Sequence, residues 1–138
     1  MIIKHWQPQD IEVVAEAMIE LRKLTFFSTL EDIVVTKEEM AKWLVQVFTE
    51  PRSTALLALD EQSLEVKAVV GVTYGELVYP PYLTVMYEWL LYGEDAKSTA
   101  MVWSEAKKWA RQRGVLLAKR SILQEDVARE SIKWEKLK

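Results

Sequence analysis

The spacing of hydrophobic residues changes several times along the first half of the chain, and each change predicts a different element. The opening stretch "IIKHW" alternates between apolar and polar residues and predicts a short strand. After Pro8, apolar residues recur at three- and four-residue steps, which predicts a helix with one apolar face. The residues of that face are Ile11, Val14, Met18, Leu21 and Leu24. A second helix is predicted to begin at the capping-box signature of Thr36 and Glu39 and to end before Pro51.

The second half of the chain predicts four more strands and two more helices. The segments "STALLALD" and "EVKAVVGVTYGEL" predict a pair of strands, and Gly71 and Gly75 in the second indicate a bulge or a close backbone approach. "LTVMYEWLLY" is apolar on both faces and predicts a central strand. "MVWSEAKKWARQRG" predicts a helix and "VLLAKRSI" a further strand. "EDVARESIKWEKLK" predicts a last helix, whose inward positions are Val127, Ile132 (or Ser131) and Trp134.

The order of elements is therefore β-α-α-β-β-β-α-β-α. We expect residues 1–138 to form a single α+β domain with a mixed sheet, a hairpin-like middle and one β-α-β crossover. The six Trp residues fall at helical or strand spacing among other apolar residues. We expect them to belong to the core rather than to a ligand site.

The composition excludes several classes of site. The chain has no Cys, which excludes disulfides and thiolate metal sites, and His5 is its single His. A zinc site built from His residues and a catalytic triad are therefore not expected, and we expect no metal. No segment approaches the roughly 20 apolar residues of a membrane span, and the first residues do not resemble a signal peptide. We expect a soluble, cytoplasmic protein.

The net charge of −3 hides an asymmetry, because residues 1–96 balance to −9 and residues 97–138 to +6. This split favours an anionic partner for the last third of the chain, although a set of solvated helix faces explains it equally well. The basic residues concerned are Lys107, Lys108, Arg111, Arg113, Lys119 and Arg120. Nucleic acid is not expected as a partner, since the chain matches no nucleic-acid motif and is acidic overall.

The segment "YGEDAKSTA", from Tyr92 to Ala100, joins the central strand to the following helix. Small residues between a strand and a helix are typical of a phosphate site, because helix N-terminal amides attract anions. Glu94 and Asp95 oppose that role, since a carboxylate near a phosphate repels it by about 1 kcal/mol in water and by several at an effective dielectric of about 20. Lys97 can offset one of these charges if its side chain turns toward the site.

The element order resembles that of the GNAT acyltransferase superfamily over nearly the whole chain. In that family a loop of the pattern Q/R-x-x-G-x-G/A begins the helix, and its amides hold the pyrophosphate of CoA. The matching stretch here runs from Asp95 to Ala100. Asp95 replaces the usual Gln or Arg and Ser98 the usual Gly, whereas Ala100 keeps the pattern. Ser98 is small and can still donate a hydroxyl hydrogen bond.

A second resemblance concerns the family pattern "A-x-x-x-Y-E-K-L-G-F" at the end of a late helix, which Ala128 and "WEKLK" match here. Trp134 replaces the Tyr whose hydroxyl often protonates the leaving thiolate, and an indole cannot act as that acid. The nearest alternative hydroxyls are those of Ser131, Tyr92 and Tyr87. The sequence stops before Gly-Phe, so the last two family strands are expected to be missing. The chain is then a shortened variant, a fragment, or one whose open sheet edge pairs with another copy or a partner protein.

The resemblance implies an acyl-CoA-dependent N-acyltransferase that moves an acetyl group from acetyl-CoA to the amine of a small molecule or a protein. The cofactor-binding amides would be those of Leu90 and Leu91 along the strand, followed by the loop residues Lys97, Ser98, Thr99 and Ala100. The implied catalytic residues are Glu88 as general base and Tyr92 as an alternative proton donor. If the carboxylates obstruct CoA, Asp95→Arg should tighten binding.

Two interpretations of Glu88 remain open from the sequence. A carboxylate among apolar neighbours in a central strand is suited to take a proton from an amine. The same Glu can lie at a solvated end of the strand or pair with a Lys, and Glu76 is a weaker candidate base of the same kind.

An alternative to the enzyme is a catalytically inactive interaction protein on the same fold. Asp95, Ser98 and Trp134 favour it, because each departs from the family pattern. Small GNAT-like proteins of tailed phages offer an analogy, and such a protein would be a component of the virion or of its assembly.

Overall fold

The computed structural model describes residues 1–23, 35–76, 83–123 and 130–137. Its elements are β1 (Ile2–His5), η1 (Pro8–Asp10), α1 (Ile11–Lys23), α2 (Lys37–Phe48), β2 (Ser53–Leu59), β3 (Val66–Glu76), β4 (Thr84–Gly93), α3 (Ala96–Arg111), β5 (Leu117–Leu123) and β6 (Glu130–Lys136). Within these residues six strands form one sheet in the order β1-β2-β3-β4-β5-β6. Only the β4–β5 pair is parallel, and the β-α-β crossover through α3 connects its two strands. The expected mixed α+β sheet is confirmed.

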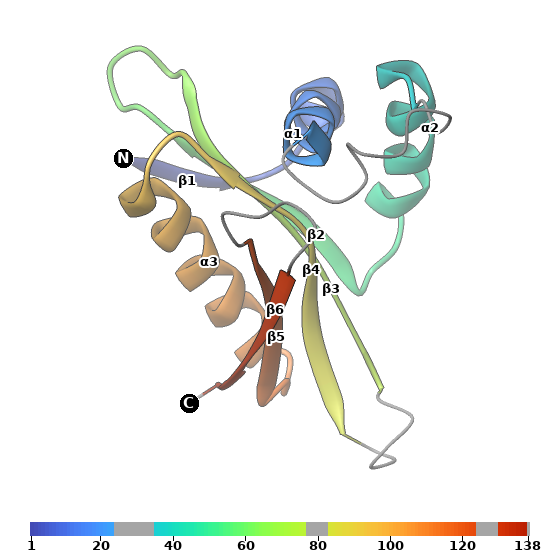
Figure 1. Ribbon diagram of the computed structural model, residues 1–138, viewed down its shortest axis with the longest axis vertical. Helices are drawn as coiled ribbons and strands as arrows, with labels where there is room; N and C mark the ends of the chain where they lie inside the picture. The colour runs from blue at the N-terminus through green and yellow to red at the C-terminus, as the bar shows by residue number, and fades with distance from the viewer. Residues whose placement is uncertain (24–34, 77–82, 124–129, 138) are drawn as a thin grey trace.

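The sheet separates two hydrophobic cores, because α3 covers one face and α1 and α2 cover the other (Figure 1). The α3-side core includes Val70, Val72, Met86, Val102, Ala106 and Trp109. The core under α1 and α2 includes Trp6, Val14, Leu44, Leu57, Val69 and Leu90. Strands β3 and β4 contribute to both cores by alternation, which explains why they are apolar on both faces.

Local signals in the sequence position the two helices on that second face. Pro8 opens the 3-10 turn η1, which leads directly into α1. Thr36 caps α2, since its hydroxyl oxygen accepts a hydrogen bond of 3.1 Å from the backbone N–H of Glu39. The predicted helix starts are confirmed at both places. None of the described helices is long and apolar enough to cross a membrane.

A β-bulge interrupts the pairing of β3 with β4 at Trp89. Gly71 lies opposite Leu90 and Val72 lies opposite Glu88, so Trp89 has no partner on β3. The indole of Trp89 lies directly over Gly71, where any Cβ would collide with the ring. A bulge bends a strand and increases its local twist. The expectation of a bulge or close approach is therefore confirmed at Gly71. It is wrong at Gly75, which pairs in register with Val85 and has open space around it.

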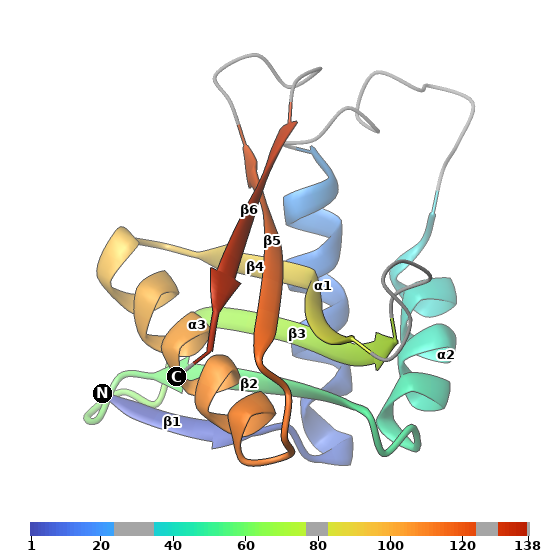
Figure 2. The ribbon, with the colours of Figure 1, turned by 90° about the horizontal axis from the view of Figure 1, so that it is seen from below.

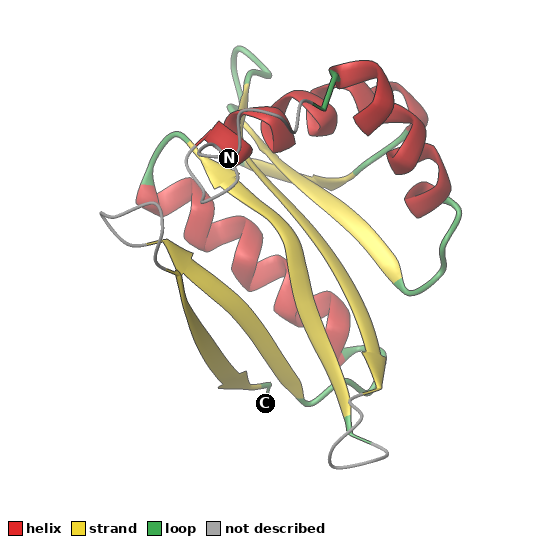
Figure 3. Ribbon diagram, turned by 45° about the vertical axis from the view of Figure 1, so that its right-hand side comes forward, coloured by secondary structure: helices red, strands yellow, loops and turns green. Residues whose placement is uncertain are grey.

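Beyond this bulge β4 and β5 separate. Their parallel pairing is confined to Val85–Tyr87 of β4 and Leu117–Lys119 of β5. Figure 2 shows β5 and β6 running across the direction of β2, β3 and β4, and Figure 3 shows the same pair of strands apart from the rest of the sheet. Beyond Tyr87, β4 therefore has no described strand partner on the side of β5, and we call this unpaired side of β4 the opening.

The last element corrects the sequence interpretation, because residues 130–136 form a strand and not a helix. β6 pairs antiparallel with β5 from Leu117↔Lys136 to Leu123↔Glu130, so the sheet does not end at β5. Ile132 and Trp134, expected inside, are 57% and 49% exposed. Val127 and Ala128 lie outside the described residues. The alternation of Ile132 and Trp134 with charged residues has a period of two, which is that of a strand.

Glu135 holds β6 against α3. Its carboxylate accepts hydrogen bonds from Nε1 of Trp103 at 3.0 Å and from Nζ of Lys107 at 2.8 Å. Burial alone would raise the pKa of Glu135, but the hydrogen bonds from Lys107 and Trp103 outweigh it and lower the pKa. The same strand alternation therefore directs Glu135 inward and Trp134 outward.

The expectation that all six Trp residues belong to the core is wrong for two of them. Trp6, Trp103 and Trp109 are buried, and Trp89 is partly buried. Trp43 is 43% exposed, although its ring meets that of Trp89 edge-on at 5.6 Å between centroids. Trp134 is 49% exposed, since none of the described helices covers it.

We predict that Gly71→Ala lowers the free energy of unfolding by about 1–3 kcal/mol, because the added methyl group collides with the Trp89 ring. Urea unfolding followed by circular dichroism measures the change. Gly75→Ala is the matched control, since nothing lies within 4 Å of the new methyl group. This control is expected to be neutral or slightly stabilising, by up to about 1 kcal/mol through the unfolded state. Equal effects of the two variants would contradict the role assigned to Gly71.

Candidate functional site

The opening between β4 and β5 leaves one side of β4 without a strand partner. From Glu88 to Gly93, β4 pairs with β3 alone among the described residues. Successive residues of a strand direct their N–H and C=O groups to alternate sides. One of the neighbours Leu90 and Leu91 therefore directs its backbone groups into the opening. A ligand chain lying there can accept and donate backbone hydrogen bonds as a further strand would.

Asp95 caps the N-terminus of α3 at the end of this opening. Its carboxylate accepts hydrogen bonds from the backbone N–H of Ser98 at 2.7 Å and from the Ser98 hydroxyl at 3.1 Å. Its backbone oxygen accepts the Thr99 hydroxyl at 2.8 Å. The Ser98 N–H is the main cause of the lowered pKa of Asp95, and the Ser98 hydroxyl and the Lys97 N–H add to it against the opposing effect of burial. The helix terminus therefore already holds an anionic group that belongs to the chain itself.

The four loop residues predicted to hold the cofactor differ in accessibility. Ser98 is fully buried, and both its N–H and its hydroxyl are directed to Asp95. The Thr99 side chain packs over Gly93, where a Cβ would collide with its hydroxyl. Lys97 and Ala100 are exposed. An incoming anion would meet the amides of Lys97 and Ser98 only by sharing them with Asp95 or displacing it.

The positive charge of Lys67 compensates the negative charge of Glu94. The sequence did not predict this ion pair. Nζ of Lys67 lies 3.2 Å from a carboxylate oxygen of Glu94 and 3.4 Å from one of Glu65. The hydrogen bond that Lys67 donates to Glu94 is the first cause of the raised pKa of Lys67. The pair joins β3 to the loop across 27 residues. Local sequence shows no such contact, which is why Lys97 was the expected partner.

Glu88 and Tyr92 lie on opposite faces of β4. Glu88 faces Val72 across the ladder, and Val72 belongs to the α3-side core. Tyr92 faces Val69 and packs in the core under α1 and α2. Cross-strand partners share a face of the sheet. The structure therefore does not bring the two predicted catalytic side chains together.

The other candidate side chains are dispersed as well. Tyr87 is 41% exposed on the face opposite Glu88. Glu76 is exposed at the end of β3. His5 donates to or accepts from the Thr54 hydroxyl at 2.9 Å, and burial lowers its pKa. Within the described ranges no group of three or more His, Cys, Asp or Glu could hold a metal ion.

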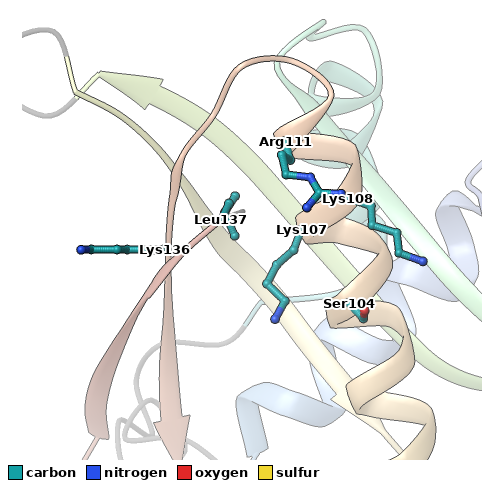
Figure 4. Close-up of a pocket in the computed structure, with 6 residues that line it drawn as sticks. All are labelled: Ser104, Lys107, Lys108, Arg111, Lys136 and Leu137. Atoms are coloured by element: carbon teal, nitrogen blue, oxygen red, sulfur yellow. The ribbon is translucent and has the colours of Figure 1, made fainter.

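The basic residues of the last third do not form one patch. Lys107, Lys108 and Arg111 line a cleft of about 240 Å³ between the C-terminal half of α3 and the end of β6 (Figure 4). Lys107 is bonded to Glu135, and Lys108 lies 3.1 Å from Glu105. Lys136 points away from the helix. Arg113 stacks on Trp109, and Arg120 lies over Trp103. Most of these charges therefore have a structural partner, as the solvated-face interpretation requires.

Comparison with known proteins identifies the fold. No protein-family model and no curated protein sequence matches the chain. The chain is similar in structure to a GCN5-related N-acetyltransferase from Ralstonia eutropha (14% identity, TM-score 0.68, covering 89% of this chain and 84% of that one). It is also similar to an aminoglycoside 6'-N-acetyltransferase from Acinetobacter haemolyticus (15% identity, TM-score 0.66, covering 92% of this chain and 83% of that one). A third similar structure is a predicted acetyltransferase with acetyl-CoA from Clostridium acetobutylicum (10% identity, TM-score 0.67, covering 89% of this chain and 81% of that one).

These structures share the arrangement of this chain over about nine tenths of its length. They do not support the alternative interpretation of the protein as a virion component. At 10–15% identity the likeness concerns the fold. The chain has the fold of the GNAT acetyltransferases.

Proposed function

We propose that the protein is an acyl-CoA-dependent N-acyltransferase that transfers an acetyl group from acetyl-CoA to an amine. The observation that carries this proposal is the opening beside β4, which leads to the N-terminus of α3 in a GNAT fold. The acetyltransferase of Clostridium acetobutylicum is a structure with acetyl-CoA, which supports the same ligand here. The backbone of Leu90 and Leu91 would bind the CoA arm, and the loop amides from Lys97 to Ala100 would hold its phosphates.

The proposed acyl transfer needs few side-chain groups. The amine attacks the thioester carbonyl, a C–N bond forms, the C–S bond breaks, and the thiolate leaves. A backbone N–H directed into the opening can stabilise the negative charge that develops on the carbonyl oxygen. Glu88 is our proposal for the group that takes the proton from the amine, directly or through water. Tyr92 lies on the other face of β4, so we assign it no step shared with Glu88.

Asp95 is the feature of the site that weakens cofactor binding. Its carboxylate occupies amides that a pyrophosphate would use, and its charge opposes that of the phosphates. Replacing it by Asn keeps a good capping residue and removes the charge, whereas Arg removes the cap as well. Asp95→Asn is therefore a sharper test than the Asp95→Arg exchange suggested by the sequence.

We expect the unaltered chain to bind acetyl-CoA at micromolar strength, with affinity that falls as salt rises. Asp95→Asn is expected to tighten the Kd about fivefold, since one repulsion of about 1 kcal/mol is removed. Isothermal titration at low and moderate salt measures both values. Glu38→Gln removes the same charge on α2, on the far side of the sheet from α3, and should leave the Kd unchanged. Absence of heat at millimolar ligand for both the unaltered chain and Asp95→Asn would overturn the proposal.

The cap itself predicts a dependence of stability on pH. Because the pKa of Asp95 is lowered on folding, its stabilisation is fully present above the ordinary value of 3.8 and is lost as pH falls through the lower folded value. The Tm difference between the unaltered chain and Asp95→Asn should be constant at neutral pH and shrink below about pH 4. Thermal melts across the acid range measure it. A difference that stays the same at every pH would show that the carboxylate is not held as described.

We predict that Glu88→Gln lowers kcat/KM for acetyl transfer by about a hundredfold or more, because a general base contributes about 10²–10⁴-fold. The Kd for acetyl-CoA should not change, since a base acts on the amine. Steady-state kinetics over a range of pH measures the loss, together with the disappearance of the acidic limb of the profile. Glu76→Gln is the matched control and should retain activity. An active Glu88→Gln enzyme with an unaltered pH profile would exclude Glu88 as the base.

A further inference from the structure

A second cleft lies at the other side of the sheet, between the end of β1, the start of β2, the turn after α2 and the end of α3. Its volume is about 380 Å³, and we call it the edge cleft. The opening lies on the far side of β4, with β3 between β2 and β4. Arg113 of the edge cleft follows α3, whose 16 residues span about 24 Å from the amides proposed for the cofactor. The edge cleft is therefore separate from the proposed cofactor site.

Arg113 is held in a fixed orientation at one wall of the edge cleft. Its guanidinium stacks on the ring of Trp109, 4.6 Å from the ring centre, and its Nη1 donates to the backbone oxygen of Trp109 at 3.1 Å. The Trp109 ring itself packs on Tyr74, with 5.5 Å between centroids. A guanidinium has five N–H donors, so these contacts leave several of them unused. In the part of the chain that the structure describes, Arg113 forms no ion pair with a carboxylate.

His5 lines the same cleft and is a second group that can carry positive charge. Its Nδ1 lies 2.9 Å from the hydroxyl of Thr54, which is buried. This contact orients the ring, and Nε2 has no partner among the described residues. Burial is the main cause of the lowered pKa of His5, the positive charge of Arg113 lowers it further, and Glu105 opposes both. His5 is therefore mostly neutral at pH 7, and an anion placed between it and Arg113 would favour the charged imidazole.

The remaining wall of the edge cleft combines apolar surface with one carboxylate. Phe48 is partly buried and Pro51 is exposed, and both line the cleft. Glu50 lines it too, but its carboxylate accepts the backbone N–H of Arg52 at 3.2 Å and is exposed. At the roughly 30 Å³ that a water molecule takes in the liquid, the cleft has room for about a dozen non-hydrogen atoms. It thus offers two nitrogen donors, an apolar surface and space for a small molecule.

We propose that the edge cleft binds a small organic carboxylate with an apolar body. The planar guanidinium of Arg113 donates to the carboxylate, a geometry that suits this group better than a spherical anion. Nε2–H of His5 donates to the same carboxylate, and the apolar body lies on Phe48 and Pro51. The inference does not depend on the proposed acyl transfer, because no group of the opening takes part in it.

The first experiment compares probes that each lack one feature of this ligand. Phenylacetate carries both the charge and the apolar body, phenylacetamide lacks the charge, and acetate lacks the body. Isothermal titration near pH 6 should give a Kd for phenylacetate about tenfold or more below that of either analogue. Saturating acetyl-CoA should leave this Kd unchanged. Equal binding of phenylacetamide, competition with acetyl-CoA, or inorganic phosphate bound as tightly at the same residues, which would mean an adventitious ion only, would each overturn the inference.

The second experiment uses His5 as a reporter, since it is the single His of the chain and gives one imidazole Cε1–H signal. An NMR pH titration should show that phenylacetate raises the pKa of His5 by about one unit. By linkage, binding takes up a proton, so the Kd should fall as pH is lowered from about 8 and level off below the pKa of the free chain. His5→Asn should bind with a Kd that does not change over this range. An unshifted His5 signal at saturating phenylacetate would contradict the proposal.

The third experiment tests the charges of the edge cleft. Arg113→Met should raise the Kd for phenylacetate about tenfold, and Arg113→Lys, which keeps the charge but not the planar fork, should raise it severalfold. Glu50→Gln should lower the Kd about twofold, since it removes an opposing charge. Arg111→Met is the matched control, because it removes the same charge from the last turn of α3 outside the edge cleft. All three positions are exposed, so the unfolding midpoints should stay close to that of the unaltered chain. Equal losses in Arg113→Met and Arg111→Met would reduce the effect to general attraction and overturn the site.

Discussion

The contact between Trp89 and Gly71 determines the shape of the sheet. Because Gly71 has no side chain, the indole can lie over it, and Trp89 and Leu90 both enter the core under α1 and α2. Two residues of β4 then oppose one of β3, and the strand bends. The pairing with β5 stops within a few residues of that bend. The unpaired side of β4, where we propose that CoA binds, thus begins next to the place where the Trp89 ring packs under α1 and α2.

Asp95 shows how a requirement of the fold competes with a requirement of the proposed function. The first amides of any helix need acceptors, and here the chain supplies its own carboxylate to those of Lys97 and Ser98. A pyrophosphate needs the same amides and carries the same sign of charge. Lys67 compensates Glu94 but is not bonded to Asp95. Helix stability and anion affinity are therefore opposed at this terminus, and the affinity for the proposed cofactor would depend on how readily Asp95 releases these amides.

Several features of the fold follow from local patterns and could be predicted. The capped start of α2, the inward positions of α3 and the bulge at Gly71 depend on neighbours in sequence. The Asp95 cap could also be predicted from the sequence, since Asp is a favoured N-cap residue and Ser98 follows three positions later. The pairing of Lys67 with Glu94 joins distant segments and leaves no local signal. The last strand was not predicted, because the positions of Val127, Ile132 and Trp134 suggest an inward helix face. The alternation of Ile132 and Trp134 with Lys133 and Glu135 instead indicates the strand that forms.

That alternation also connects the two faces of the hairpin formed by β5 and β6. Trp103 and Lys107 of α3 hold the carboxylate of Glu135, which fixes the direction of one side chain of β6. In a strand the next side chain must then point the other way, so Trp134 is directed outward beside Lys119. The hydrogen bonds that Glu135 accepts on the α3 face of the sheet thus determine which residues of β6 are exposed on the other face.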